Sequence, residues 1–205
     1  MFRIVLKKSL LVVFSLFALL PLIAGAEEEA DHAIHEELRA VLHTVESAIN
    51  SGDYDKMLPV LSENVPATPV NQEFLTSRPE VSAYFKKWFG PKGYLKKLEI
   101  KLTPDAPTTL SADKSWGLVT GAGVERYILS DDRHYDINTR WTAVMVKEDD
   151  GHWRIRAMHI ATNFLDNPLL SEAEHALGKA AALGGVIGLI LGAILAWLLT
   201  RKKKS

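Results

Sequence analysis

The spacing of hydrophobic positions divides the chain into an N-terminal part with helical periodicity and a later part with strand periodicity. Residues 31–51 place apolar side chains three and four positions apart, which predicts an amphipathic helix. A short second helix is predicted after Asp53, limited by Pro59. A third begins at the capping-box sequence "SRPE" and ends at Gly90. Three helices are therefore expected before residue 95.

After residue 94 the hydrophobic period changes to two. Four segments alternate in this way, at residues 95–102, 115–129, 134–146 and 152–162. Gly121 and Gly123 lie inside the second of them, and interior glycines in a strand are typical of a bulge or bend. The expected fold class is α+β, with three N-terminal helices packed on a curved antiparallel sheet.

The first 26 residues have the pattern of a secretory signal peptide. Arg3, Lys7 and Lys8 precede an apolar run, and Ala24 and Ala26 form an A-x-A cleavage site. An uncleaved membrane anchor is the alternative. The short apolar run, interrupted by a proline, favours cleavage after Ala26, which leaves residues 27–166 as the exported domain.

A second apolar segment, residues 180–200, contains no Asp, Glu, Lys or Arg. As a helix it would be about 31 Å long, which matches the hydrocarbon core of a bilayer. The tail at 201–205 begins "RKKK", and such positive charge is retained in the cytoplasm. Residues 167–179 are expected to form a juxtamembrane stalk helix. Gly184, Gly188 and Gly192 recur every four residues, which predicts close association of two spans.

Charge agrees with this division of the chain. All 25 acidic residues lie within residues 27–178, together with only 16 of the 24 Lys and Arg, so this part carries a net charge of −9. Such a domain is not suited to binding nucleic acid phosphates. The chain has no cysteine, which excludes disulfides and thiol nucleophiles.

The order of elements resembles the NTF2-like, or SnoaL-like, cone fold. The resemblance rests on "SGDYDKML" after the first helix, "RPEVSAYFKKWF" in the third, and "TRWTAV…KEDDGHWRIRAMHIAT" in the last hairpin. It covers roughly residues 30–164. Such a cone encloses a pocket between helices and sheet, and it serves enzymes as well as binding and assembly modules. The resemblance implies that His159 and Arg140 face this pocket.

The register of the last hairpin decides which side chains meet. A two-residue turn at Asp149-Asp150 would place Arg140 opposite His159. A type I turn followed by a glycine bulge would place Trp141 there instead, with Arg140 on the other face. Alternation from Trp153 through Ile155 also predicts that His159 faces the pocket and is shielded from water.

Tyr127 and Asp136 are further polar candidates for the pocket. Enzymes with this cone that move protons use a buried carboxylate beside a donor such as tyrosine. No carboxylate lies at a position that the alternation predicts to be inward. The leading hypothesis is therefore a non-catalytic binding or assembly module, and no cofactor or metal is expected.

The sequence thus predicts a single-pass protein of a bacterial inner membrane, with its domain in the periplasm and its C-terminus in the cytoplasm. The expected partners are the membrane, a second copy of the chain, and a small hydrophobic ligand or an envelope protein. One alternative is a SnoaL-like enzyme of isomerase, cyclase or dehydratase type acting on a small hydrophobic substrate. Another is a scaffold that only oligomerises.

Overall fold

The computed structural model describes residues 31–202, so the signal-peptide segment at 1–26 lies outside the described residues. A helix occupies residues 31–51 and is followed by the 3-10 helix η1 (Tyr54–Val60) and the α-helix α2 (Arg78–Phe89). The strands are β1 (Ala67–Thr68), β2 (Leu95–Pro104), β3 (Thr109–Leu110), β4 (Trp116–Leu129), β5 (His134–Lys147) and β6 (Trp153–Thr162). The chain continues into the long helix α3 (Pro168–Lys202). The predicted α+β arrangement with a curved sheet is confirmed.

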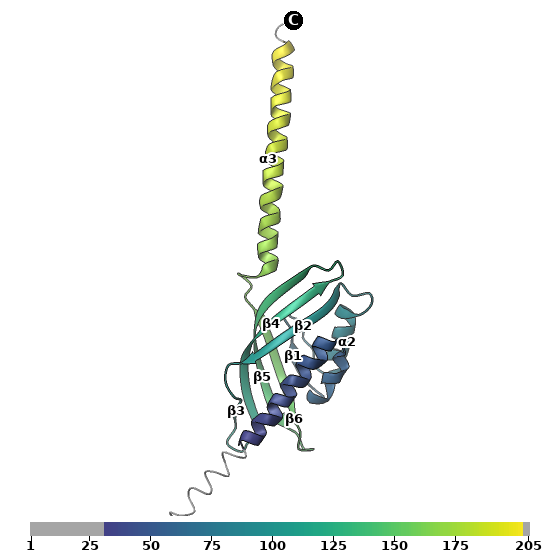
Figure 1. Cartoon of the computed structure of the whole chain (residues 1–205), viewed down its shortest axis with the longest axis vertical. Coiled ribbons are helices and arrows are strands. Elements are labelled where there is room, and N and C mark those ends of the chain that lie inside the picture. The colour runs from purple at the N-terminus through teal and green to yellow at the C-terminus, as the bar shows by residue number, and fades with distance from the viewer. Residues whose placement is uncertain (1–30, 203–205) are drawn as a thin grey trace, which may run out of the picture.

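The strands form one sheet in the order β1-β6-β5-β4-β2, with β3 paired to the beginning of β4. All pairs are antiparallel except β1 with β6. Figure 1 shows the curved sheet with the helix at residues 31–51 lying across one of its faces. The hydrophobic core lies between this helix, the η1–α2 segment and inward side chains of β2, β5 and β6, with partly buried side chains of β4 packed against it.

The helix at residues 31–51 also covers the edge strand of the sheet. The side-chain amide of Asn50 donates to the carbonyl of Ile100 at 2.9 Å and accepts from its backbone N–H at 2.6 Å. Glu46 accepts from the backbone N–H of Leu102 at 2.6 Å. These bonds satisfy backbone groups of β2 that an exposed edge would leave open. Gly52, with φ of 75°, then ends the helix in the left-handed conformation.

Gly121 and Gly123 do not mark a bulge, because the register between β4 and β5 is continuous through both of them. They face inward and make room for side chains of β5. A Cβ at Gly121 would lie 2.2 Å from Trp141 Cζ2, and one at Gly123 would lie 2.6 Å from Thr139 Oγ1. Of the two alternatives, a bulge or a bend, the bulge is wrong, while the curved sheet is confirmed. The glycines allow close packing of the sheet against its own side chains.

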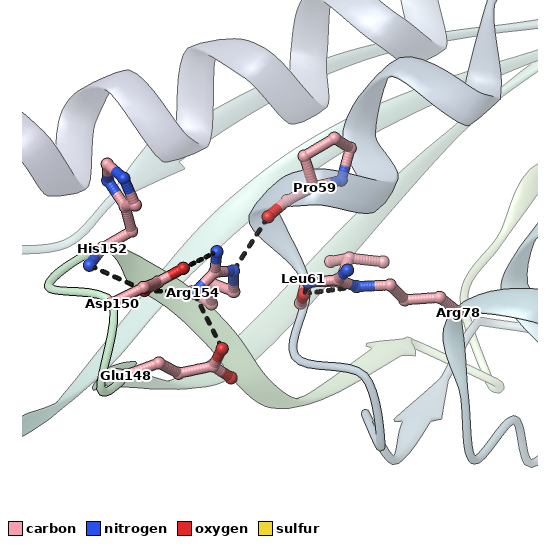
Figure 2. A network of polar contacts seen from close by, with 7 residues as sticks. All are labelled: Pro59, Leu61, Arg78, Glu148, Asp150, His152 and Arg154. Atoms are coloured by element: carbon pink, nitrogen blue, oxygen red, sulfur yellow. Dashed lines mark hydrogen bonds and ion pairs between the residues drawn. The ribbon is translucent and has the colours of Figure 1, made fainter.

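Two arginines, Arg154 from β6 and Arg78 from α2, bind backbone carbonyls at the end of the η1 segment (Figure 2). Arg154 donates from Nε to the carbonyl of Pro59 at 3.0 Å and from Nη1 to Glu148 at 2.7 Å. Its Nη2 also pairs with Asp150 at 2.5 Å. Arg78 donates from Nε to the carbonyl of Leu61 at 2.7 Å. The guanidinium groups therefore bind backbone carbonyls that the short 3-10 helix leaves without partners.

Helix α3 extends away from the cone as a single continuous helix (Figure 1). Among the described residues it is the one helix long and apolar enough to cross a membrane, by its length and composition. Its first turns touch the cone, where Glu172 accepts from Arg133 Nη1 at 3.2 Å and from the hydroxyl of Tyr135. The helix passes through Gly178 without a break.

Candidate functional site

The cone encloses two adjoining cavities lined mainly by apolar side chains. The larger, of about 340 Å³, lies between the first half of the helix at residues 31–51 and strands β5 and β6. The smaller, of about 90 Å³, lies deeper, between the end of that helix, α2 and β4. We call them the outer chamber and the deep chamber. Four residues line both chambers: Val45, Leu102, Met158 and Ile160.

The outer chamber has an apolar interior and a margin with two polar side chains. Trp141, Ala143 and Met145 from β5 form one wall. The only ionisable side chains of its lining are His35 and Arg39, which lie on successive turns of the first helix. Arg39 is exposed and pairs with Glu36 at 2.6 Å. A ligand in this chamber would therefore bury an apolar body and meet charge only at the margin.

The deep chamber contains a buried carboxylate. Glu125 is 4% exposed, and the hydroxyl of Tyr127, two residues along the same face of β4, donates a hydrogen bond to it. Burial raises the pKa of Glu125, although its hydrogen bond with Tyr127 and the nearby hydroxyl of Thr139 act in the opposite direction. The Thr139 hydroxyl is itself buried and makes no hydrogen bond of ordinary geometry. A ligand with a hydrogen-bond donor could satisfy the second carboxylate oxygen.

Two tyrosines beside this carboxylate keep their protons. Burial and the nearby charge of Glu125 raise the pKa of Tyr127. Burial also raises the pKa of Tyr84, with smaller effects from Glu73 and Glu125. Both phenols are therefore neutral hydrogen-bond donors at physiological pH. One carboxylate and two phenols are the polar groups of an otherwise apolar chamber.

Glu125 was not predicted to face inward, although the sequence carried a signal. Period-two alternation back from Leu129 and Tyr127 leads directly to Glu125, and all three lie on the inner face of β4. The signal was obscured because Gly121 and Gly123 occupy the preceding inward positions and show no hydrophobic side chain. A glutamate that continues a face of glycines looks like part of a polar surface.

The prediction that His159 is shielded on the concave face is wrong. Close to the turn the bulged register is confirmed, since Glu148 N–H donates to His152 O at 3.0 Å and Gly151 has φ of 81°. Farther along, Val144 pairs with Ala157 but Met145 pairs with Ile155, so Arg156 is an extra residue in β6. This bulge reverses the alternation. His159 is therefore exposed opposite Thr142, while its neighbours Met158 and Ile160 line the chambers.

The other sequence candidates are divided between the two faces of the sheet. Trp141 lines the outer chamber and Tyr127 the deep chamber. Arg140 is exposed and pairs with Asp105, and Asp136 forms a bidentate pair with Arg126 at 2.7 and 2.9 Å. Arg140 and Asp136 therefore do not reach the cavity. Ligand binding by any of these residues stays a prediction.

The outward face of the sheet is partly apolar. Trp116, Leu118 and Val124 of β4 are 48%, 42% and 43% exposed. In α3, a Cβ added at Gly184, Gly188 or Gly192 would meet no atom within 4 Å. Both surfaces leave room for a second molecule. Within residues 31–202, no group of three or more His, Asp or Glu side chains is placed to hold a metal ion.

No family model matches the chain, and no curated protein matches it by sequence. Solved structures do resemble it. A hexachlorocyclohexane dehydrochlorinase (LinA, type 2) superposes with a TM-score of 0.57 at 10% identity, over 66% of this chain and 90% of that one. An NTF2-like superfamily protein from Salmonella enterica gives 0.53 at 15% identity, over 64% and 92%. A cystatin-like domain of unknown function from Nostoc punctiforme gives 0.52 at 18% identity, over 80% and 96%. At these identities the likeness shows the fold, which is the NTF2-like α+β cone.

Proposed function

We propose that this chain is a membrane-anchored NTF2-like module that binds a small, largely apolar ligand inside the cone. The observation that carries this proposal is the pair of apolar chambers with a single buried carboxylate, Glu125, at the deep end. An apolar lining favours hydrophobic ligands, and a few well-placed polar groups fix the orientation of the bound ligand. The ligand class is therefore a compact hydrophobic molecule with one hydrogen-bonding group.

The proposal places the cone in the periplasm of a bacterial cell, anchored in the inner membrane by α3. The support is the acidic domain on one side of the apolar helix and the basic "RKKK" segment on the other. Alkaline phosphatase is active only after export, so fusion after residue 165 should give activity in a bacterial host. Fusion after residue 205 should give none. Activity of the C-terminal fusion would reverse the proposed orientation.

Ligand binding can be tested by filling the outer chamber. Ala143 is 7% exposed and lines this chamber, whereas Val144 points to the other face of β5. We expect Ala143→Phe to lower affinity for the polarity-sensitive dye prodan at least tenfold, because the added ring occupies the cavity. Val144→Phe adds the same ring outside the cavity and should bind like the unmodified chain. Binding is measured by energy transfer from the tryptophans of the cone to the dye, with the full chain in lipid vesicles and Trp197→Phe as the background that removes transfer from the span.

Equal dye binding by both variants would show that the dye does not occupy the chamber. The absence of dye binding by the unmodified chain would contradict the proposal itself. A circular dichroism spectrum and an unfolding curve for each variant establish that Ala143→Phe retains the fold.

The buried Glu125–Tyr127 pair favours a second candidate function, proton transfer on a hydrophobic substrate. A carboxylate whose pKa is raised by burial is suited to act as a general base, and a neutral tyrosine can donate to a developing oxyanion. One structural neighbour is an enzyme, the dehydrochlorinase. The test is hydrogen–deuterium exchange next to the carbonyl of a cyclic ketone. Exchange by the chain that Glu125→Gln abolishes would favour the enzyme over the binding module.

We also propose a homodimer formed through the outward sheet face and the span. The exposed Trp116, Leu118 and Val124 support the first contact, and the glycine stripe of α3 supports the second.

A further inference from the structure

A groove of about 490 Å³ lies between the first turns of α3 and the adjacent end of the sheet. We call it the stalk groove. Most of its lining is apolar or aromatic, including Tyr127 from the sheet and Leu169, Ala173 and Ala176 from α3, with Arg133 and Glu172 as the charged pair. That pair, at 3.2 Å, ties the helix to the cone beside the groove. The groove thus lies at the end of the cone from which the apolar helix leaves.

The stalk groove and the deep chamber share a thin partition. Tyr127 lines both of them. On the opposite side, Pro69 lines the deep chamber, and the next residue, Val70, lines the groove. One tyrosine ring and one turn of a loop therefore separate the two spaces. The loop continues through Gln72, which has a positive φ of 64°.

An apolar surface of α3 leads from the groove toward the span. Leu169, Ala173 and Ala176 line the groove, and Ala180 continues the same face at helical spacing. From Leu169 to Ala180 a helix rises about 17 Å. The acidic Glu174 lies on the opposite side of the helix and outside the groove lining. A hydrophobic molecule that leaves the bilayer along this face would meet apolar side chains as far as the groove.

We infer that the stalk groove is the route by which a lipophilic ligand passes between the bilayer and the deep chamber, with Tyr127 as the movable partition. This inference rests on the proposed function and adds the source of the ligand: a membrane-dissolved, uncharged hydrophobic molecule. Swinging the ring of Tyr127 aside breaks its hydrogen bond to Glu125. A ligand that brings its own donor to Glu125 replaces that bond, so the polar group of the ligand favours entry.

The absence of native cysteine allows a reversible test. Ala173→Cys places a thiol in the groove, and Glu174→Cys places the matched thiol on the far side of the helix. Both positions are exposed. A benzyl methanethiosulfonate reagent then adds the same aromatic group to either site, and a reductant removes it. Trp197→Phe serves as the common background, so that energy transfer to prodan does not arise from the span.

Prodan is added to vesicles containing the full chain, and the rise of energy transfer from the cone is followed in time. Blocking Ala173→Cys should slow this rise at least tenfold while final occupancy is unchanged, and reductant should restore the rate. The same reagent at Glu174→Cys should change neither. Tyr127→Ala should accelerate entry, because it removes the partition.

The outcomes separate the route from the function on which it rests. An unchanged rate after blocking at position 173, with normal final occupancy, would overturn the route and leave ligand binding intact, with entry at the His35–Arg39 margin. No energy transfer in any variant, the Trp197→Phe background chain included, would overturn the proposed function and the route together.

Discussion

Replacing Gly121 with alanine should destabilise the cone more than the same change at either of the other glycines of β4, Gly117 or Gly123. The new Cβ would lie 2.2 Å from Trp141 Cζ2 and 2.5 Å from the carbonyl oxygen of Thr103. Neither neighbour can yield easily. Thr103 belongs to β2, which is paired with β4 along this stretch, and the indole N–H of Trp141 donates to Ala122 O at 2.9 Å.

The cost follows from these contacts. Overpacking a well-packed site costs roughly 1–3 kcal/mol. Displacing Trp141 also lengthens its hydrogen bond to Ala122, worth about 1 kcal/mol. We therefore expect Gly121→Ala to lower the free energy of unfolding by about 3 kcal/mol. For a cone of this size that corresponds to a fall in Tm of roughly 12 °C.

The assay is urea unfolding of the full chain in detergent micelles, followed by tryptophan fluorescence and extrapolated to zero denaturant. Gly178→Ala is the matched control, because a Cβ there meets no atom within 4 Å. It should be neutral or stabilising by up to about 1 kcal/mol, the ordinary gain of Gly→Ala in a helix.

A double-mutant cycle tests the mechanism directly. Trp141→Phe removes the part of the ring that the new methyl group would meet, so Gly121→Ala should cost at least about 1 kcal/mol less in that background. Additivity within about 0.5 kcal/mol, or a Gly121→Ala variant as stable as the unmodified chain, would refute the packing argument.

Three further predictions concern other parts of the molecule. Arg154→Met should lower the free energy of unfolding by about 2–3 kcal/mol, because it leaves two carboxylates and the Pro59 carbonyl without their donor. Arg156→Met, whose guanidinium makes one bond to Asn64 O, should cost less than about 1 kcal/mol in the same urea assay. Burial raises the pKa of Glu125, so the folded cone holds this proton more tightly than the unfolded chain. Stability from this group is then fully present below the carboxyl's ordinary pKa of about 4.3 and declines as pH rises through the higher folded value. Glu125→Gln should remove that decline in Tm, and an identical pH profile would contradict the assignment. Gly188→Ile should weaken self-association of the isolated span in a membrane two-hybrid assay, whereas Leu189→Ile, off the glycine stripe, should not; equal effects would mean that the stripe is only composition.

The sequence predicted the elements of this fold well because each depends on local periodicity. The four long strands lie within two residues of the segments that alternate, and the helix at residues 31–51 buries the stripe that its spacing predicts. The acidic turn of the last hairpin could also be predicted from the sequence, because Gly151 is suited to the positive φ that a bulged turn requires.

The candidate site was harder to predict because it depends on which side chains of long strands point inward and which point outward. One extra residue, Arg156, exchanges the inward and outward positions that follow it in β6. No local pattern in "WRIRAMHIAT" predicts this bulge. His159 was therefore assigned to the wrong face. The inward position of Glu125 could be predicted from the alternation of side chains along β4. Its burial, however, depends on helix packing that the strand's own sequence does not contain.

The continuity of α3 has a mechanical consequence. The non-helical segment 163–167 joins β6 to α3, and the helix then runs unbroken from Pro168 to Lys202, tied to the cone through Glu172, Arg133 and Tyr135. A rotation of α3 about its axis would act on the end of the sheet through these side-chain contacts, next to Tyr127. In the proposed homodimer, the angle at which the two α3 helices pack would therefore influence the angle at which the two cones face each other.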